Sequence, residues 1–339
     1  MDEAYPIGKL PAEDLERILD RLPKSNDTRI VVGPGIGEDA AVISFDKTVL
    51  VAKSDPITFA TDRIGWYAVH VNANDIATMG ATPKWFLATL LLPENATTPE
   101  LIEHIFQGIT EACRDLNVTL CGGHTEITHG LTRPIVVGQM LGEADKKDIV
   151  SASGTCIGDD ILLTKGIAIE ATALIAIEKS DELAEHFSPT FLARCRNYLQ
   201  DPGISVVRDA QIAQATGGIH AMHDPTEGGL ASGLREMATA SGCGLILEAD
   251  TVCLLPEPEA LCRHYQLDPL GSIASGALLL TVDPVFTPRI IDALKQAGIP
   301  SARIGSIQSQ EAGCKMIRQG AVCDLPTFQR DEIGKVFEG

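Results

Sequence analysis

One polar segment, Ala144–Gly158, separates two stretches of sequence in which strand-like and helix-like patterns alternate. Before it, the hydrophobic spacing predicts helices at 11–22, 62–79 and 99–116, and strands at 30–32, 40–43, 48–54, 84–93, 118–123 and 134–144. After it, the spacing predicts helices at 168–178, 181–199, 205–215, 229–240 and 286–297, and strands at 159–166, 244–249, 277–283 and 302–307. Since 339 residues usually form more than one core, we predict two domains, 1–150 and 151–339, each mixing strands with helices.

The charge and apolar content of the chain exclude several classes of partner. Lysine and arginine number 27 against 46 aspartates and glutamates, so the formal net charge is -19. Such a field repels nucleic-acid backbones and anionic lipid surfaces, and no apolar run approaches the roughly 18 residues of a membrane span. We therefore predict no nucleic-acid partner and no membrane. An anionic nucleotide would need Mg²⁺ and backbone amides to bind.

The nine cysteines form no regular pattern. Their spacing is irregular and no CxxC motif occurs, which argues against a disulfide framework and against a zinc site of the usual kind. Free or buried thiols in a reducing compartment explain them best, so we predict a cytoplasmic protein.

The first candidate site is the glycine-rich stretch Gly33–Asp39. Glycines let backbone N–H groups converge on an anion, and the acids Glu38 and Asp39 can hold the Mg²⁺ that bridges phosphates. No GK[ST] follows and no predicted helix begins here, so the stretch is neither a Walker loop nor a dinucleotide fingerprint. A tight turn between two strands explains it equally well.

Two further carboxylates are candidate metal ligands. Asp55 directly follows the predicted strand 48–54, where an ordinary turn residue is the alternative. Asp75 falls in the middle of the apolar face of the predicted helix 62–79, with Asn72 nearby on the same face. A buried carboxylate must be paired, hydrogen-bonded or bound to metal. We favour metal, and a buried cap of a loop amide is the alternative.

Two glycine-containing segments complete the set of candidates. Cys121–Glu126, with the sequence CGGHTE, is placed at a strand end, where its glycines suit close approach to a ligand. His124 within it is more often structural than catalytic, and its spacing to Glu126 and His129 matches no standard zinc site. The segment 223–230, with the sequence HDPTEGGL, precedes a predicted helix and suits a phosphate or Mg²⁺, or else a helix start capped by Thr226.

Taken in order, these segments resemble the superfamily of aminoimidazole ribonucleotide (AIR) synthetase, selenophosphate synthetase, thiamine-monophosphate kinase and the hydrogenase maturation factor HypE. GIGEDAAVI resembles the family's GxGDDAAV, and VNANDIATMGATP resembles N-D-[LI]-A-x-M-G-A-x-P. CGGHTE resembles the GG[DEH]T turn, and HDPTEGGL is most similar to DPTRGGL of the HypE type. The likeness covers nearly the whole chain.

The resemblance implies an α/β domain followed by an α+β domain, a homodimer formed through the N-terminal sheet, and ATP with Mg²⁺ as cofactors. It implies phosphoryl transfer to an oxygen of an acceptor, either a small molecule or a protein carboxamide. The implied metal ligands are Glu38, Asp39, Asp55 and Asp75, where Glu38 replaces an Asp and is longer by a methylene. The implied cofactor-binding residues are Gly35, Gly37, Asp39, Asn72, Gly122, Gly123, Thr125, Gly228 and Gly229. The catalytic candidates are Asp224 and His124.

Two other functions remain open beside an ATP-dependent enzyme with an unassigned acceptor. One is an ATP-binding accessory protein in metallocentre maturation without turnover of its own. The other is thiamine-monophosphate kinase, which His124 disfavours because the kinase has an acidic residue there.

The end of the sequence differs from that of the HypE factors, which carry a terminal Cys that receives a carbamoyl group. Here the last cysteine is Cys323, and an amphipathic run with Ile333, Val336 and Phe337 follows it. We expect this run to dock on the surface and Cys323 not to serve as the acceptor.

The predicted strands of the first half also suggest a dimer. They are strongly apolar with little alternation, which is typical of sheets covered on both faces. The helices at 62–79 and 99–116 can cover one face, which leaves the other for a second copy.

Overall fold

The computed structural model describes residues 10, 12–19, 21, 26–58 and 63–337. Contacts divide the chain into two compact units. One, here called the N-terminal unit, comprises 25–33 and 39–149. The other, the C-terminal unit, comprises 1–24, 34–38 and 150–339. The glycine-rich loop 34–38 therefore belongs with residues far later in the sequence.

A six-stranded sheet forms the N-terminal unit, in the order β1-β2-β3-β6-β4-β5. Its strands are β1 (Ile30–Val32), β2 (Ala41–Phe45), β3 (Thr48–Ile57), β4 (Thr82–Pro93), β5 (Thr119–Thr128) and β6 (Ile135–Asp145). All neighbours pair antiparallel except β4 and β5, which are parallel and are joined through helix α3 (Pro99–Asp115). β5 and β6 follow each other in sequence but lie on opposite sides of β4.

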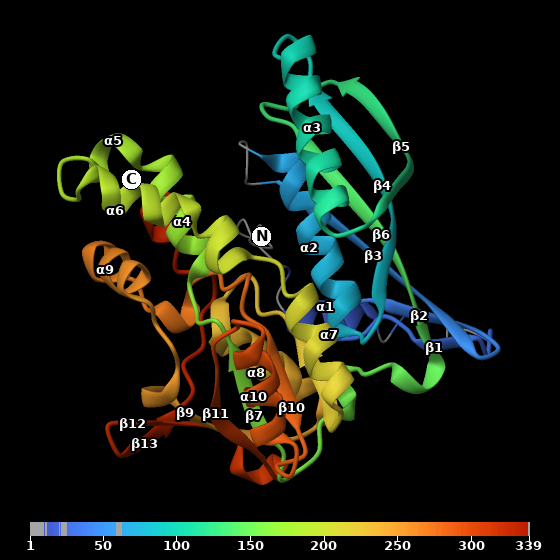
Figure 1. Ribbon diagram of the computed structural model, residues 1–339, viewed down its shortest axis with the longest axis vertical. Helices are drawn as coiled ribbons and strands as arrows, with labels where there is room; N and C mark the ends of the chain where they lie inside the picture. The colour runs from blue at the N-terminus through green and yellow to red at the C-terminus, as the bar shows by residue number, and fades with distance from the viewer. Residues whose placement is uncertain (1–9, 11, 20, 22–25, 59–62, 338–339) are drawn as a thin grey trace. The chain divides into compact units, whose positions relative to one another are not determined.

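Helix α2 (Ile64–Thr78) packs on β3, β6 and β4, and α3 packs on α2, so that the two helices cover one face of the sheet (Figure 1). Two glycines bring the helices together. A Cβ at Gly65 would collide with the Ile105 carbonyl, and one at Gly108 would lie 3.1 Å from the Trp66 nitrogen. The expectation of a one-sided apolar face on α2 is wrong, because α3 covers its outer side and 14 of its 15 residues are buried.

The other face of this sheet is half-covered within one chain. In β4 the side chains of Phe86, Ala88, Leu90 and Leu92 are buried, whereas the intervening Leu87, Thr89 and Leu91 are only partly buried. One face of the strand therefore packs under α2, and the other presents apolar groups that a second copy can cover.

We predict that the protein sediments at about twice its chain mass at micromolar concentration, because dimerisation removes this apolar face from water. Replacing Leu91 by Lys should shift the sedimentation coefficient toward that of one chain. Glu103→Lys, on the exposed side of α3, should leave it unchanged. A wild-type protein that sediments as a single chain would contradict the prediction.

The C-terminal unit is built on a seven-stranded sheet in the order β13-β12-β9-β11-β7-β10-β8. Its strands are β7 (Asp160–Thr164), β8 (Ile219–His223), β9 (Gly244–Glu248), β10 (Leu279–Val282), β11 (Ser301–Gln308), β12 (Cys314–Arg318) and β13 (Ala321–Asp324). Its α-helices are α1 (Ala12–Leu19), α4 (Ile169–Glu178), α5 (Ser180–Leu183), α6 (Pro189–Asn197), α7 (Val207–Thr216), α8 (Gly229–Ser241), α9 (Pro256–Tyr265), α10 (Thr287–Gln296) and α11 (Gly334–Phe337). One core lies between α8 and the sheet, and a second lies among α4, α6 and α9.

Several predicted elements differ from the observed ones. The single helix expected over 181–199 is two helices, because Ser188 accepts from the Phe191 amide as an N-cap and Pro189 begins α6. Strand β5 continues to Thr128, so the polar turn expected from His124 onward begins later. β8, α9, β12, β13 and α11 were not predicted. Part of the helix expected at 11–22, including Leu22, lies outside the described residues.

The segment after β13 docks as expected. Val336 is buried against the α4–α6–α9 core, and Ile333 packs beside it. Asp331 fastens the segment further, since its carboxylate accepts from the Gly228, Ile273 and Ile333 amides. Phe337 is 44% exposed. Among the described helices, none combines the length and apolar character needed to cross a bilayer.

Candidate functional site

Three of the predicted ligand residues meet between β3 and α2 in the N-terminal unit. The Lys53 ammonium Nζ lies 3.3 Å from Asp75 Oδ2 and 3.9 Å from Asp55 Oδ2. Asn72 Nδ2 donates to the Asp55 carbonyl at 3.3 Å and to the Ala68 carbonyl at 2.8 Å. One lysine thus joins two carboxylates that are far apart in sequence. It was not singled out from the sequence, because nothing local shows which charges will meet.

The absence of a side chain at Gly138 lets Asn72 of α2 reach the backbone of β3. Gly138 of β6 pairs with Asp55 of β3, and a Cβ there would collide with Asn72 Nδ2. Without a side chain at this position, α2 lies close enough for Asn72 to reach the β3 backbone. The sheet and helix thereby hold Asp55 and Asp75 in fixed positions.

The charges of the cluster suit a divalent cation. Asp75 is 6% exposed and Asp55 is partly exposed, so one carboxylate is desolvated and the other faces water. Lys53 balances one of the two negative charges. Two carboxylates and an amide carbonyl are hard oxygen donors of the kind that Mg²⁺ prefers, so the residues present fit that ion.

Asp39 lies at the same end of β3 as Asp55. The register pairs Ala41 with Ala52, and Asp39 precedes Ala41 by two residues. Gly35, Gly37 and Glu38 belong to the C-terminal unit, where Gly37 has a φ of 78° and a Cβ on it would lie 2.9 Å from the Glu236 carbonyl of α8. Packing against α8 therefore requires glycine at 37 whether or not a ligand binds, and the roles of Gly35 and Glu38 stay predictions.

The CGGHTE segment lies inside β5, not at a strand end as expected. The register pairs Gly123 with Ala88 and His124 with Thr89 of β4. Gly123 has a φ of 149°, and a Cβ there would collide with the Ala88 carbonyl, so sheet packing explains this glycine. The binding roles of Gly122 and Thr125 stay predictions.

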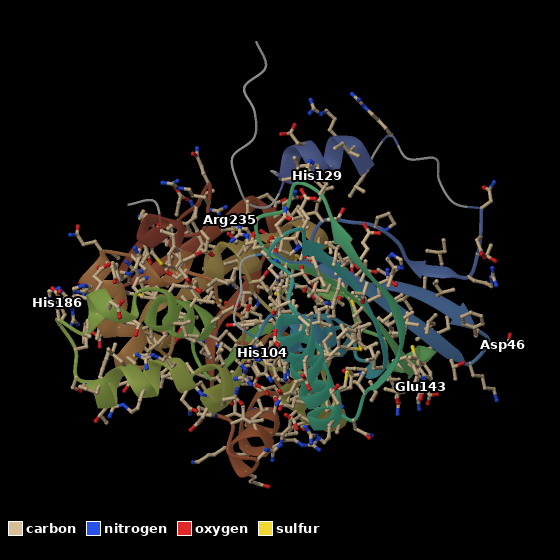
Figure 2. All side chains as sticks on the ribbon, turned by 90° about the horizontal axis from the view of Figure 1, so that it is seen from above. Asp46, His104, His129, Glu143, His186 and Arg235 are labelled. Atoms are coloured by element: carbon tan, nitrogen blue, oxygen red, sulfur yellow. The ribbon has the colours of Figure 1, made fainter. Side chains whose placement is uncertain are left out.

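His124 is exposed on this edge strand, with its Nε2 3.2 Å from Glu126 Oε2. His129, labelled in Figure 2, is 91% exposed and contacts Glu94 instead. Within the described ranges, neither histidine belongs to a group of three metal-ligating side chains. The zinc site that the sequence disfavoured thus finds no support, and the catalytic role of His124 stays a prediction.

The loop before α8 in the C-terminal unit already has an anionic partner. Gly228 and Gly229 have φ values of 78° and 64°, and the Gly228 amide donates to Asp331 Oδ2 at 2.7 Å. The amide expected to bind a phosphate therefore holds a carboxylate of the same unit. Asp224 is buried at 2% exposure directly after β8, and its catalytic role stays a prediction.

Two acids near this loop, Glu170 and Asp331, have raised pKa values. Burial, opposed by a hydrogen bond from Ser275 and aided by the charges of Asp331 and Glu227, raises the pKa of Glu170 to about 7. Burial likewise raises the pKa of Asp331 to about 6, although three backbone amides oppose the change. Neither residue was found from the sequence, where Glu170 looks like any helical glutamate and Asp331 lies more than 100 residues from its partner loop.

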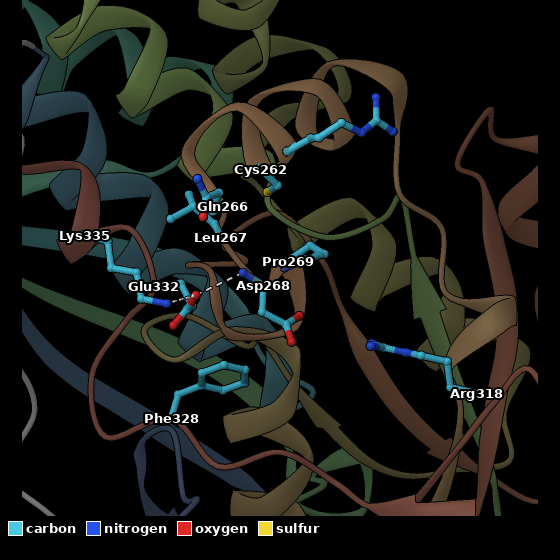
Figure 3. Close-up of a pocket in the computed structure, with 10 residues that line it drawn as sticks. Cys262, Gln266, Leu267, Asp268, Pro269, Arg318, Phe328, Glu332 and Lys335 are labelled. Carbon is cyan, nitrogen blue, oxygen red and sulfur yellow. Dashed lines mark hydrogen bonds and ion pairs between the residues drawn. The ribbon is translucent and has the colours of Figure 1, made fainter. Parts of the chain in front are cut away.

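A shallow pocket of about 780 Å³ lies elsewhere in the C-terminal unit, where the docked segment meets α9 (Figure 3). Glu332 crosses it, with Oε2 accepting from the Asp268 amide at 3.0 Å and from Lys335 Nζ at 2.6 Å. Phe328 lines its wall. It contains none of the residues predicted to bind a ligand.

We predict that Glu170→Gln gains stability relative to wild type as pH rises from about 4.5 to 7. A raised pKa in the folded state means that wild type binds the proton more tightly when folded, so its stability falls across this window. The relative gain should be on the order of 3 kcal/mol, since one pKa unit is worth about 1.4 kcal/mol. Urea unfolding at several pH values measures it. A stability difference that stays constant with pH would show that Glu170 ionises as an ordinary exposed residue does.

The fold and the residues that it brings together define a protein of two mixed α/β units, with an acid–lysine cluster in the first and a glycine-rich helix entrance in the second. Family models describe both parts. Residues 37–144 match the AIR synthase related protein, N-terminal domain, and residues 157–314 match the C-terminal domain of the same family. These matches cover more than half of the chain, so it belongs to the AIR synthase related family, which is a family of enzymes.

Individual relatives agree. A hydrogenase expression/formation protein of Methanocaldococcus jannaschii is 26% identical over 292 residues, which is 83% of each chain. The carbamoyl dehydratase HypE of Cupriavidus necator is 26% identical over 256 residues, 74% of this chain and 70% of that one. The crystal structure of a hydrogenase maturation protein HypE in complex with ATP superposes with a TM-score of 0.73 at 22% identity, covering 94% of this chain and 96% of the other. The predicted family and the predicted two-part fold are confirmed.

Proposed function

We propose that this chain is an ATP- and Mg²⁺-dependent enzyme that transfers the γ-phosphoryl group of ATP to an oxygen of an acceptor, such as a carboxamide. The observation that carries the proposal is the cluster of Asp55, Asp75 and Lys53. It lies in the part of the chain that matches the family model, and a solved HypE with a similar fold binds ATP.

The cluster has the groups that phosphoryl transfer requires. In this proposal Asp55 and Asp75 hold Mg²⁺, which neutralises phosphate charge when bound. Lys53 then turns its ammonium from the carboxylates to the phosphate oxygens. Asn72 holds α2 against β3, so the distance between the Asp55 and Asp75 carboxylates stays fixed. The bond from the γ-phosphorus to the bridging oxygen breaks, the bond to the acceptor oxygen forms, and ADP leaves.

We place this reaction in the cytoplasm. All nine cysteines are free thiols in the structure, although several are exposed, which suits a reducing compartment. The acidic surface disfavours nucleic acid as the acceptor, so we propose a small molecule or a protein carboxamide.

We predict that Asp75→Asn weakens the binding of Mg²⁺·ATP at least about tenfold, because the substitution removes a buried negative charge that faces the cation. Isothermal titration calorimetry measures it. Asp46→Asn is the matched control, because Asp46 lies in the turn between β2 and β3, away from the cluster. Asn fills nearly the same volume as Asp, and a thermal melt checks the fold. If Asp75→Asn binds Mg²⁺·ATP as tightly as wild type, the assignment of the metal site is wrong.

A screen for ADP release distinguishes the proposed enzyme from the two other functions. Stimulation by a carboxamide or carboxylate supports the proposal and identifies the acceptor class. Stimulation by thiamine phosphate alone would identify the kinase instead. Tight ATP binding with no ADP release for any acceptor would favour an accessory protein.

We predict that Cys323 takes up no carbamoyl group. Cys323 is in β13, paired with Met316 of β12, and Leu325 just after it is buried in the core beside the sheet. The chain is therefore fixed at Cys323 by pairing with β12 and just beyond it by the buried Leu325. The thiol cannot travel to a distant site. Intact mass spectrometry after incubation with ATP and a carbamoyl donor system should show the unmodified chain. An adduct that maps to Cys323 and disappears in Cys323→Ser would restore a self-acceptor mechanism.

A further inference from the structure

A thiol, a carboxylate and an imidazole converge in the C-terminal unit, apart from every residue discussed above. Cys156, Asp159 and His220 each offer one ligand atom, and these atoms all lie within 4.8 Å of one another. Sulfur, oxygen and nitrogen donors of these three types are the ligands that zinc takes in proteins. The spacing of these residues in the sequence resembles no zinc motif, because one ligand comes from a separate strand.

A rigid turn presents the first two ligands. The Asp159 amide donates to the Cys156 carbonyl at 3.1 Å, and Gly158 between them has a φ of 96°, as this turn requires. Asp159 Oδ2 accepts from the Cys156 amide at 2.9 Å and closes the turn. Two backbone bonds with Ile307 of β11, at 3.1 and 2.9 Å, fix the turn to the sheet. The backbone that carries these two ligands is therefore held in place before any ion binds.

The third ligand comes from the edge strand β8. His220 Nδ1 lies 2.9 Å from both carboxylate oxygens of Asp159. The Asp159 side chain is only 4% exposed, His220 is 36% exposed, and Cys156 is exposed. The carboxylate is thus the buried member of the group, and the thiol faces the solvent from which an ion would bind.

A hydrogen-bonded Asp–His pair explains two of the three residues but not the thiol. Cys156 is exposed, so core packing does not account for it, and its Sγ donates a hydrogen bond to the Gly154 carbonyl at 3.4 Å. A metal ion accounts for all three side chains at once, because a thiolate, a carboxylate and an imidazole can all coordinate it.

We propose that Cys156, Asp159 and His220 bind one Zn²⁺ ion, with water as the fourth ligand. On binding, the Cys156 thiol gives up its proton to solvent, and His220 binds as a neutral ring through a nitrogen that carries no proton, with its one ring proton on the other nitrogen. The thiolate and carboxylate together balance the two charges of the ion. The three donor atoms already lie within 4.8 Å of one another, so small side-chain rotations can place all three at ligand bond lengths of about 2.0–2.3 Å. The thiolate selects zinc over Mg²⁺, so this site differs in chemistry from the acid–lysine cluster.

Titration with Co²⁺ and then Zn²⁺ tests the proposal on the full-length, reduced, chelator-treated protein. Co²⁺ should produce a thiolate-to-cobalt charge-transfer absorption at one ion per chain, and Zn²⁺ should abolish it by displacement. Carboxylate sites produce no such absorption, so Asp75→Asn should leave it intact. This control separates the outcome from that of the proposed ATP site.

Cys156→Ser should remove the absorption, and His220→Gln should weaken Zn²⁺ binding at least about tenfold. Cys323→Ser, which alters another exposed thiol of the same unit, should change neither. Circular dichroism melts show whether each variant is folded. Because Cys156 is exposed, we expect Cys156→Ser to fold as wild type does. The proposal is overturned if wild type shows no thiolate-to-cobalt absorption, or if folded Cys156→Ser and His220→Gln bind Zn²⁺ as wild type does.

Discussion

The burial of the Asp75 carboxylate places a strong constraint on the N-terminal unit. A carboxylate in this position loses most of its hydration, and a buried charge without compensation would cost several kcal/mol. Lys53 reduces that cost from the neighbouring strand. The lysine in turn draws in Asp55, so the desolvation of one side chain determines the arrangement of three. The cluster is therefore a consequence of how closely α2 packs on the sheet.

Much of the fold was predictable because apolar spacing is a local signal. β4 and α3 were found nearly to the residue, since one is a continuous apolar run and the other an amphipathic stripe. The start of α6 at Pro189 is also a local signal, because Ser188 caps the helix and Pro189 begins it. The strand predicted at 118–123 ended too early, because the second half of β5 is polar and exposed and shows no alternation of buried and exposed residues.

The candidate site was predictable in its residue types but not in its pairings. Asp55, Asp75 and Asn72 stand out because polar side chains interrupt apolar segments. Lys53 does not stand out, because its importance comes from two partners that only the folded chain brings near. The glycines were a less reliable guide to the site. Gly37 and Gly123 looked suited to a ligand, yet neighbouring backbone already excludes a side chain at both positions.

The contact of Asp331 with the Gly228 amide has a consequence for any anion that approaches the loop. Asp331 is tethered to the same unit, so it competes as an intramolecular ligand whose effective concentration is on the order of millimolar or higher. A singly charged anion at ordinary cellular concentration would lose to it. A ligand with several charges, held by contacts elsewhere as well, would win. Any anion that displaces Asp331 from the Gly228 amide must therefore gain binding energy from a second point of attachment.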